Sequence, residues 1–129
     1  AVGNETNEEE HSGMQMYVQI GESTFTATLE ENTAVDALIE MMEQGPVTIA
    51  MSDYSGFEKV GPLGTSLPTS NQQTTTQAGD IVLYQGNQIV LFYGSNSWSY
   101  TRLGHINDLA GWEEALGSGD VTVTFALEG

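Results

Sequence analysis

Two short apolar segments separated by a tight turn constrain the fold of this chain more than any other feature. Residues 81–84 read IVLY and residues 89–93 read IVLFY, with a Gly-Asn pair at positions 86–87 between them. Strands that are apolar on both faces are buried on both sides, as in a barrel or a sandwich. Gly-Asn suits a hairpin turn with positive φ angles. The segment therefore predicts a hairpin inside a β-rich core.

Alternating apolar and polar residues, typical of half-buried strands, occur elsewhere in the chain. Together with the hairpin, the expected strands cover residues 14–20, 23–29, 47–51, 81–84, 89–93, 100–106 and 121–127. Residues 52–64 are rich in turn-forming residues and predict an irregular segment, with a small excursion around Tyr54 and Phe57. Residues 65–78 are almost wholly polar and predict either a surface connection or a loop lining a site.

A first amphipathic helix is predicted after the second strand. Its apolar residues recur at spacings of three and four and form one buried stripe: Val35, Leu38, Ile39 and Met42. The helix is capped either by Asn32 or by a box formed by Thr33 and Asp36. Gly45 ends it, and Pro46 prevents its continuation.

A second, shorter helix is predicted before the last strand. It is expected to start at Asn107 or Asp108, to end at Gly117 and to bury three apolar residues, Leu109, Trp112 and Leu116. Seven or eight short strands with two helices favour a mainly β fold, a closed barrel or a sandwich, because the helices then cover its apolar ends.

The charge of the chain is strongly unbalanced. Eighteen acidic residues stand against only Lys59 and Arg102, which gives a formal net charge of −16. Nucleic-acid binding needs a basic surface, and none can be assembled from two cations. Anionic membranes would also repel this chain, whereas a cationic peptide or protein would be attracted to it. The acidity therefore serves either solubility or the attraction of a cationic partner.

A chain of 129 residues predicts one domain. Residues 1–13 are acidic and lack apolar periodicity, so we expect a disordered tether there and the barrel domain at residues 14–129. A polar tether is what a removed signal or lipoprotein leader leaves behind. We therefore expect export, either to the periplasm or to a lipid-anchored place in the cell envelope, while a cytoplasmic location stays open. No transmembrane segment is expected, and a monomer is the default.

The sequence carries no signature of metal, cofactor or covalent chemistry. It has no cysteine, which excludes disulfides and thiolate sites in this chain. His105 lies near Asp108, but no third ligand accompanies them, so we expect no metal site. Neither a phosphate-binding glycine motif nor a nucleophile elbow is present, and no cofactor is expected.

Four strings resemble the bacterial cyclophilin-like domain family, over roughly residues 14–127. They are GDIVLYQGNQIVLFYG, SYTRLGHI, LAGWEEAL and GDVTVTFAL. The resemblance implies a closed antiparallel barrel of about eight strands, capped by two short helices. This fold is related in shape to the cyclophilins, which are peptidyl-prolyl isomerases.

The resemblance also implies a candidate groove. Cyclophilins place an arginine near the prolyl nitrogen, a glutamine on the substrate backbone, a phenylalanine beneath the proline, and a tryptophan and a histidine at its sides. Matching positions here are Gln72 or Gln73 for the glutamine, Phe92 for the floor and Trp98 for the tryptophan, with Tyr100 in place of the histidine. The expected ligand-binding residues are Gln72, Gln73, Phe92, Trp98, Tyr100 and Arg102, with Arg102 and Phe92 as the candidates for catalysis.

The arginine is the departure from the cyclophilin pattern. Residues 47–60, where the resemblance would place it, contain only Lys59, and Arg102 belongs to a different strand. Lysine lacks the planar fork of the guanidinium group. The leading interpretation is therefore a non-catalytic module that binds a peptide or a small ligand. A weak or atypical peptidyl-prolyl isomerase and a structural domain of a surface assembly are the alternatives.

Overall fold

The structure is a computed structural model that describes residues 14–127. The predicted tether, residues 1–13, lies outside the described residues. Nine strands and two helices are described, in the order β1 (Gln15–Ile20), β2 (Ser23–Leu29), α2 (Thr33–Gln44), β3 (Val47–Tyr54), β4 (Glu58–Pro62), β5 (Gln72–Thr75), β6 (Asp80–Tyr84), β7 (Gln88–Phe92), β8 (Ser97–Ile106), α3 (Trp112–Leu116) and β9 (Val121–Ala126). Within this part of the chain, neither helix is long and apolar enough to cross a membrane.

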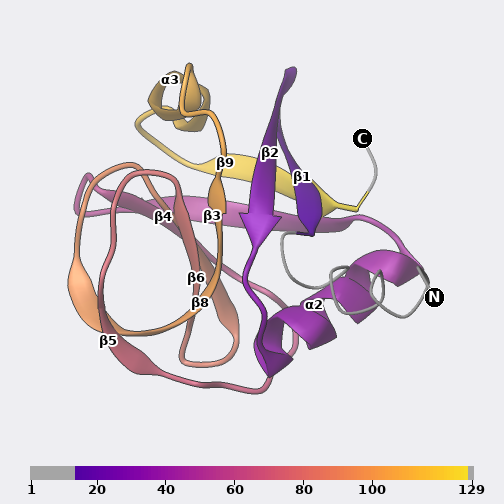
Figure 1. The fold of residues 1–129 in the computed structure, drawn as a ribbon. Helices are drawn as coiled ribbons and strands as arrows, with labels where there is room; N and C mark the ends of the chain where they lie inside the picture. The colour runs from indigo at the N-terminus through magenta and orange to yellow at the C-terminus, as the bar shows by residue number, and fades with distance from the viewer. Residues whose placement is uncertain (1–13, 128–129) are drawn as a thin grey trace.

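Eight of the strands form a closed antiparallel barrel (Figure 1). Their order is β2-β1-β9-β3-β4-β7-β6-β8, and pairing between β2 and β8 closes the ring. At this closure Gly104 lies opposite Leu29, and a Cβ atom at Gly104 would come within 2.5 Å of the Thr28 carbonyl oxygen. The strand β8 therefore continues through Gly104, and it needs glycine there to approach β2. The predicted mainly β barrel with two short helices is confirmed.

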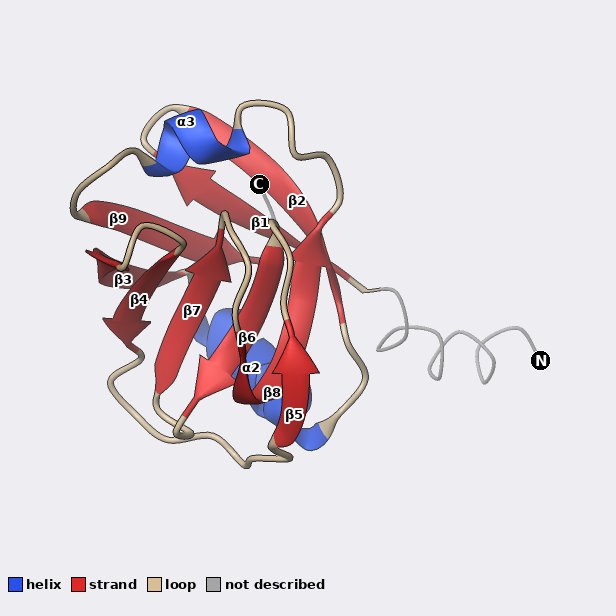
Figure 2. Ribbon diagram, turned by 90° about the vertical axis from the view of Figure 1, so that its left-hand side faces the viewer, coloured by secondary structure: helices blue, strands red, loops and turns tan. Residues whose placement is uncertain are grey.

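The barrel interior is filled by alternate residues of the strands. On β6 and β7, Ile81 pairs with Leu91 and Leu83 pairs with Ile89, and all four side chains are fully or almost fully buried. Leu38 of α2 reaches the same apolar interior, while the Trp112 ring of α3 packs edge-on against Phe25 with centroids 5.0 Å apart. Figure 2 shows α3 at the upper end of the barrel and α2 behind the lower part of its strands.

The helices differ from prediction at their starts. Asn32 is the cap of α2, and its Oδ1 atom accepts a hydrogen bond from the Val35 N–H at 2.8 Å. The capping box of Thr33 and Asp36 is not the cap. The second helix starts at Trp112 rather than near Asn107. Residues 109 and 110 consequently precede the helix, and Leu109 is 45% exposed instead of buried.

The end of β3 and the whole of β4 lie where the sequence predicts irregular structure. β3 extends to Tyr54, and β4 follows it with the residues EKVGP, whose two charges, glycine and proline each favour a loop. Pairing with β3 on one side and β7 on the other overrides these preferences. The turn between β6 and β7 also lies one residue earlier than predicted, since Gln85 and Gly86 have the positive φ angles, 56° and 78°.

Candidate functional site

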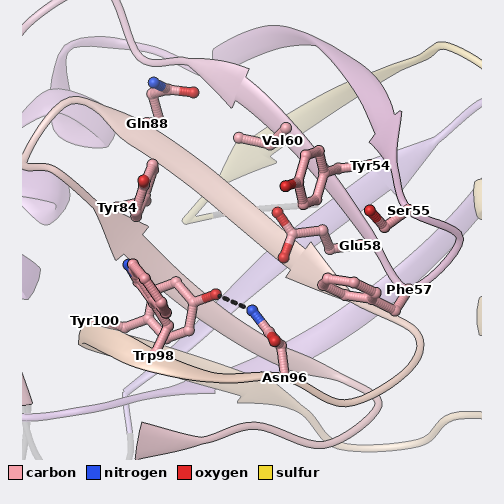
Figure 3. A pocket seen from close by; sticks show the side chains of 10 residues that line it. All are labelled: Tyr54, Ser55, Phe57, Glu58, Val60, Tyr84, Gln88, Asn96, Trp98 and Tyr100. Carbon is pink, nitrogen blue, oxygen red and sulfur yellow. Dashed lines mark hydrogen bonds between the residues drawn. The ribbon is translucent and has the colours of Figure 1, made fainter. Parts of the chain in front are cut away.

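A cavity of about 560 Å³ lies on the outer face of the barrel. It forms because β8 changes partner along its length: Thr101 and later residues pair with β6, whereas Ser97–Tyr100 pair with the short strand β5. Residues of the β3–β4 hairpin, the β6–β7 hairpin and the start of β8 surround the cavity (Figure 3). They are Tyr54, Ser55, Phe57, Glu58, Val60, Tyr84, Gln88, Asn96, Trp98 and Tyr100.

The β3–β4 hairpin supplies one aromatic wall. Ser55 and Gly56 have φ angles of 56° and 76°, which are suited to a tight two-residue turn. Tyr54 and Phe57 flank this turn, and their rings meet edge-on with centroids 5.8 Å apart. Gly94 packs directly against Phe57, and its N–H donates to the Phe57 carbonyl at 2.9 Å. A Cβ atom on Gly94 would lie only 2.7 Å from the Phe57 Cβ, so this close contact requires glycine.

Tyr84, Trp98 and Tyr100 form the opposite wall (Figure 3). The rings of Tyr84 and Tyr100 are 6.1 Å apart, and the Tyr100 hydroxyl accepts a hydrogen bond of 2.8 Å from Asn96 Nδ2. Burial is the main reason why the pKa of Tyr100 lies above its usual value. Trp98 is 56% exposed. Its indole is therefore available for contact with a ligand.

Phe92 supports the cavity from below without lining it. Its side chain is fully buried in a small cluster with Val82, Val90 and Tyr100, separate from the core inside the barrel. The Phe92 ring is parallel to the Phe57 ring, with centroids 6.4 Å apart, and lies 5.6 Å from the Tyr100 ring. Phe92 thus positions one residue of each aromatic wall.

The feature that sequence reasoning missed is Glu58. Its side chain lines the cavity between the two walls and is only 6% exposed. No atom of the described residues forms a hydrogen bond with its Oε1 atom. Burial, followed by the charge of Asp53, raises the pKa of Glu58 to about 7. Residues 52–64 predict an irregular, turn-rich segment, so the sequence alone does not place Glu58 on a strand that faces a site.

The other predicted site residues lie outside this cavity. Gln72 and Gln73 are exposed on β5, opposite Tyr100 and Ser99 in the ladder, and neither lines the cavity. Arg102 is on β8, where its Nη2 atom is 3.3 Å from Asp80 Oδ1 and its Nε atom is 3.9 Å from Glu30 Oε2. The structure thus brings Trp98 and Tyr100 together over Phe92, and it leaves the two glutamines and the arginine elsewhere.

The cavity offers the chemistry of a binding site. Four kinds of group face it: aromatic rings, a buried carboxylate, a side-chain amide at each of Gln88 and Asn96, and the Ser55 hydroxyl. Neither Lys59 nor Arg102 is among the lining residues. Within residues 14–127, no three His, Cys, Asp or Glu side chains are grouped so that they could hold a metal ion.

The closed barrel of eight antiparallel strands with two helices is a cyclophilin-like fold. The chain matches the Cyclophilin-like family over residues 18–126, and it belongs to that family. No curated protein matches the chain. The solution structure of a hypothetical protein from Archaeoglobus fulgidus is similar, with a TM-score of 0.63 and 13% identity over 88% of this chain and 94% of the other. At that identity the similarity concerns the fold alone.

Proposed function

We propose that this domain is a non-catalytic binding module whose outer cavity holds a peptide segment or a small ligand. The observation that carries this proposal is the open cavity of about 560 Å³ between two aromatic walls. Ligand sites are typically concave, about 300–1,000 Å³ in volume, and lined by aromatic residues with a few polar groups. The cavity fits that description, and Trp98 exposes more than half of its surface there.

The alternative of a purely structural domain is less well supported. A structural role would favour a groove filled by side chains of the protein itself, whereas this one is open. The Phe57 and Tyr100 rings are held in place by packing on Phe92, so the walls need little reorganisation when a ligand enters. Pre-organised aromatic walls reduce the entropic cost of binding.

The alternative of a peptidyl-prolyl isomerase also loses support at this cavity. The cyclophilin pattern requires a cationic hydrogen-bond donor beside the prolyl nitrogen, and the cavity presents the Glu58 carboxyl instead. Arg102 is engaged by Asp80 and Glu30. We therefore expect no measurable acceleration when a proline-containing peptide is followed by isomerisation kinetics.

Ligand-observed NMR with a library of peptides and small molecules tests the binding proposal. Each compound that binds the wild-type domain is expected to lose at least tenfold in affinity for Trp98→Ala. Leu109→Ala is the matched control, since Leu109 is also a large exposed apolar residue but does not line the cavity. Ligands that bind both variants as tightly as the wild type, or a library without any ligand, would contradict the proposal.

A further inference from the structure

Glu58 distinguishes this cavity from a neutral aromatic pocket. A carboxylate that is more than nine-tenths buried normally has hydrogen-bond partners for its oxygens, because burial without them is costly. Glu58 is 6% exposed, and its Oε1 atom accepts no hydrogen bond from any described residue. In Figure 3 the carboxyl group projects into the middle of the cavity, from the side of Tyr54 and Phe57.

The aromatic walls add a second attraction of the same sign. Aromatic faces carry partial negative charge and attract cations, and a cage of aromatic rings around a cation is a common means of recognising ammonium groups. Five aromatic residues line this cavity, Tyr54, Phe57, Tyr84, Trp98 and Tyr100. The net charge of −16 attracts cations to the domain over a longer range.

We propose that the ligand of this cavity carries an alkylammonium group, which binds between the two aromatic walls with its charge against the Glu58 carboxylate. The inference rests on the proposed binding function and specifies its ligand class. The same chemistry is present in a free small amine and in the lysine side chain of a peptide. Both provide a positive charge on an apolar stem, which matches a carboxylate surrounded by aromatic rings.

The test uses pairs of probes, one cationic and one neutral. Choline is compared with 3,3-dimethylbutan-1-ol, which has the same shape and no charge. A Lys-Pro peptide acetylated at its N-terminus is compared with its norleucine counterpart, which lacks the ammonium group. The chain provides an internal reference for NMR: Trp98 lines the cavity, while Trp112 is buried and donates its Nε1–H to the Phe92 carbonyl at 2.9 Å. We expect the cationic probes to shift the Trp98 indole resonance, with little effect on that of Trp112.

Each cationic probe is expected to bind at least tenfold more tightly than its neutral partner. Binding of the lysine peptide alone would identify a protein segment as the ligand, and binding of choline as well would identify alkylammonium groups in general. Equal affinities within both pairs would overturn the cation inference and leave the binding function standing. If no probe binds, the cation inference also fails. The proposed binding function is tested separately by the NMR screen of the compound library.

Glu58→Gln keeps the shape of the side chain and removes its charge. This variant should abolish the preference for each cationic probe over its neutral partner. Glu43→Gln is the control at pH 8, where Glu58 is mostly ionised, because Glu43 is exposed on α2 and the substitution changes the net charge by about the same amount. If Glu43→Gln weakens choline binding as much as Glu58→Gln does, the attraction belongs to the whole surface and the inference fails.

The pH dependence of the affinity provides an independent test of the proposal. If only ionised Glu58 binds the cation, a pKa of about 7 makes the apparent affinity rise about tenfold between pH 6 and pH 8. The charged and titratable groups around Glu58 are Asp53 and Tyr54 of β3, Tyr84 of β6 and Tyr100 of β8. The pKa of Asp53 is lowered and that of Tyr100 is raised, so both shifts lead away from this range. An affinity that rises as the pH falls would overturn the proposal, since a protonated carboxyl group would then donate to a neutral ligand.

Discussion

Glu58 and Lys59 are neighbours on β4 and both are buried, but their charged groups differ in whether they have partners. Lys59 points into the barrel, beside Leu91, where its Nζ atom donates to the Gly119 carbonyl at 2.5 Å and lies 3.3 Å from Asp53 Oδ1. Glu58 points outward, beside Phe92, with an Oε1 atom that forms no hydrogen bond to the described residues. The buried ammonium group on the inner face thus has a hydrogen-bond acceptor and a counter-ion, whereas an oxygen of the buried carboxylate on the outer face has no hydrogen-bond donor among the described residues.

The difference separates stability from function. Buried charges that are paired and hydrogen-bonded belong to the framework. A buried group without a partner is unusual and needs an explanation, which the proposed binding role supplies. Asp53 links the two environments: it accepts a hydrogen bond from the Tyr93 hydroxyl and pairs with Lys59, and its negative charge contributes to the raised pKa of Glu58. Substitutions on the two faces should therefore have effects of different kinds.

The largest expected effect is that of Lys59→Met. Removal of the ammonium group takes the side-chain donor from the Gly119 carbonyl and leaves Asp53 with the Tyr93 hydroxyl and the Gly56 N–H but no counter-charge. Breaking a buried ion pair typically costs about 3–5 kcal/mol. Asp53 is partly exposed, so we expect the lower end of that range. Urea unfolding at pH 7 measures the loss. The double variant with Asp53→Asn should recover part of it, and a fully additive double variant would contradict the pairing.

Glu58→Gln should act in the opposite direction. The folded-state pKa of about 7 lies above the ordinary value of 4.5, so the folded protein binds a proton that the unfolded chain has released. Stability is therefore lost as the pH rises from about 4.5 to 7, by about 3 kcal/mol in total. The glutamine variant has no carboxyl group to titrate at this position, so it does not lose this stability as the pH rises. It should match the wild type near pH 4 and exceed it by up to about 3 kcal/mol at pH 8.

Unfolding free energies of the two proteins across this pH range provide the measurement. The difference between their curves isolates Glu58 from the other titrating groups. Glu43→Gln, on the exposed face of α2, should run parallel to the wild type throughout. A glutamine variant that is less stable than the wild type at pH 8 would show that ionised Glu58 has a stabilising partner.

The sequence predicts the interior of this molecule better than its cavity. Strands such as β6 and β7, and the apolar stripe of α2, are visible because burial imposes a regular spacing of apolar residues. β4 and β5 escape detection because their residues are charged, small or polar and become strands only by pairing with β3, β7 and β8. Local patterns cannot reveal such tertiary pairing.

The candidate site depends on the same missed strands. The resemblance to the cyclophilins selects Trp98 and Tyr100, and both line the cavity, with Trp98 exposed and Tyr100 buried. Glu58 is recognisable only once β4 is a strand, because only then does its position relative to Phe92 fix the face on which it lies. The resemblance calls for an arginine in the groove and makes Arg102 the candidate, but Asp80 and Glu30 hold its side chain elsewhere.

Trp98→Ala should separate binding from folding. The indole is 56% exposed, so its removal should change the free energy of unfolding by no more than about 0.5 kcal/mol. Loss of an aromatic wall should nevertheless weaken ligand binding by at least about tenfold, equivalent to about 1.4 kcal/mol. Titration of the variant and urea unfolding measure the two quantities. A loss of stability above about 1 kcal/mol would place Trp98 in the framework instead.

The smallest effect is expected from Arg102→Ala, which tests whether the arginine belongs to the site. Its contacts with Asp80 and Glu30 are partly solvent-exposed, and such ion pairs contribute about 0.2–1 kcal/mol. Stability should fall by that amount, less at high salt, because ions screen exposed charges. Ligand affinity should not change, since Arg102 does not line the cavity. Proline-peptide isomerisation by the wild type that disappears in Arg102→Ala would reverse this assignment, because the arginine would then have to leave its carboxylates and act on a bound substrate.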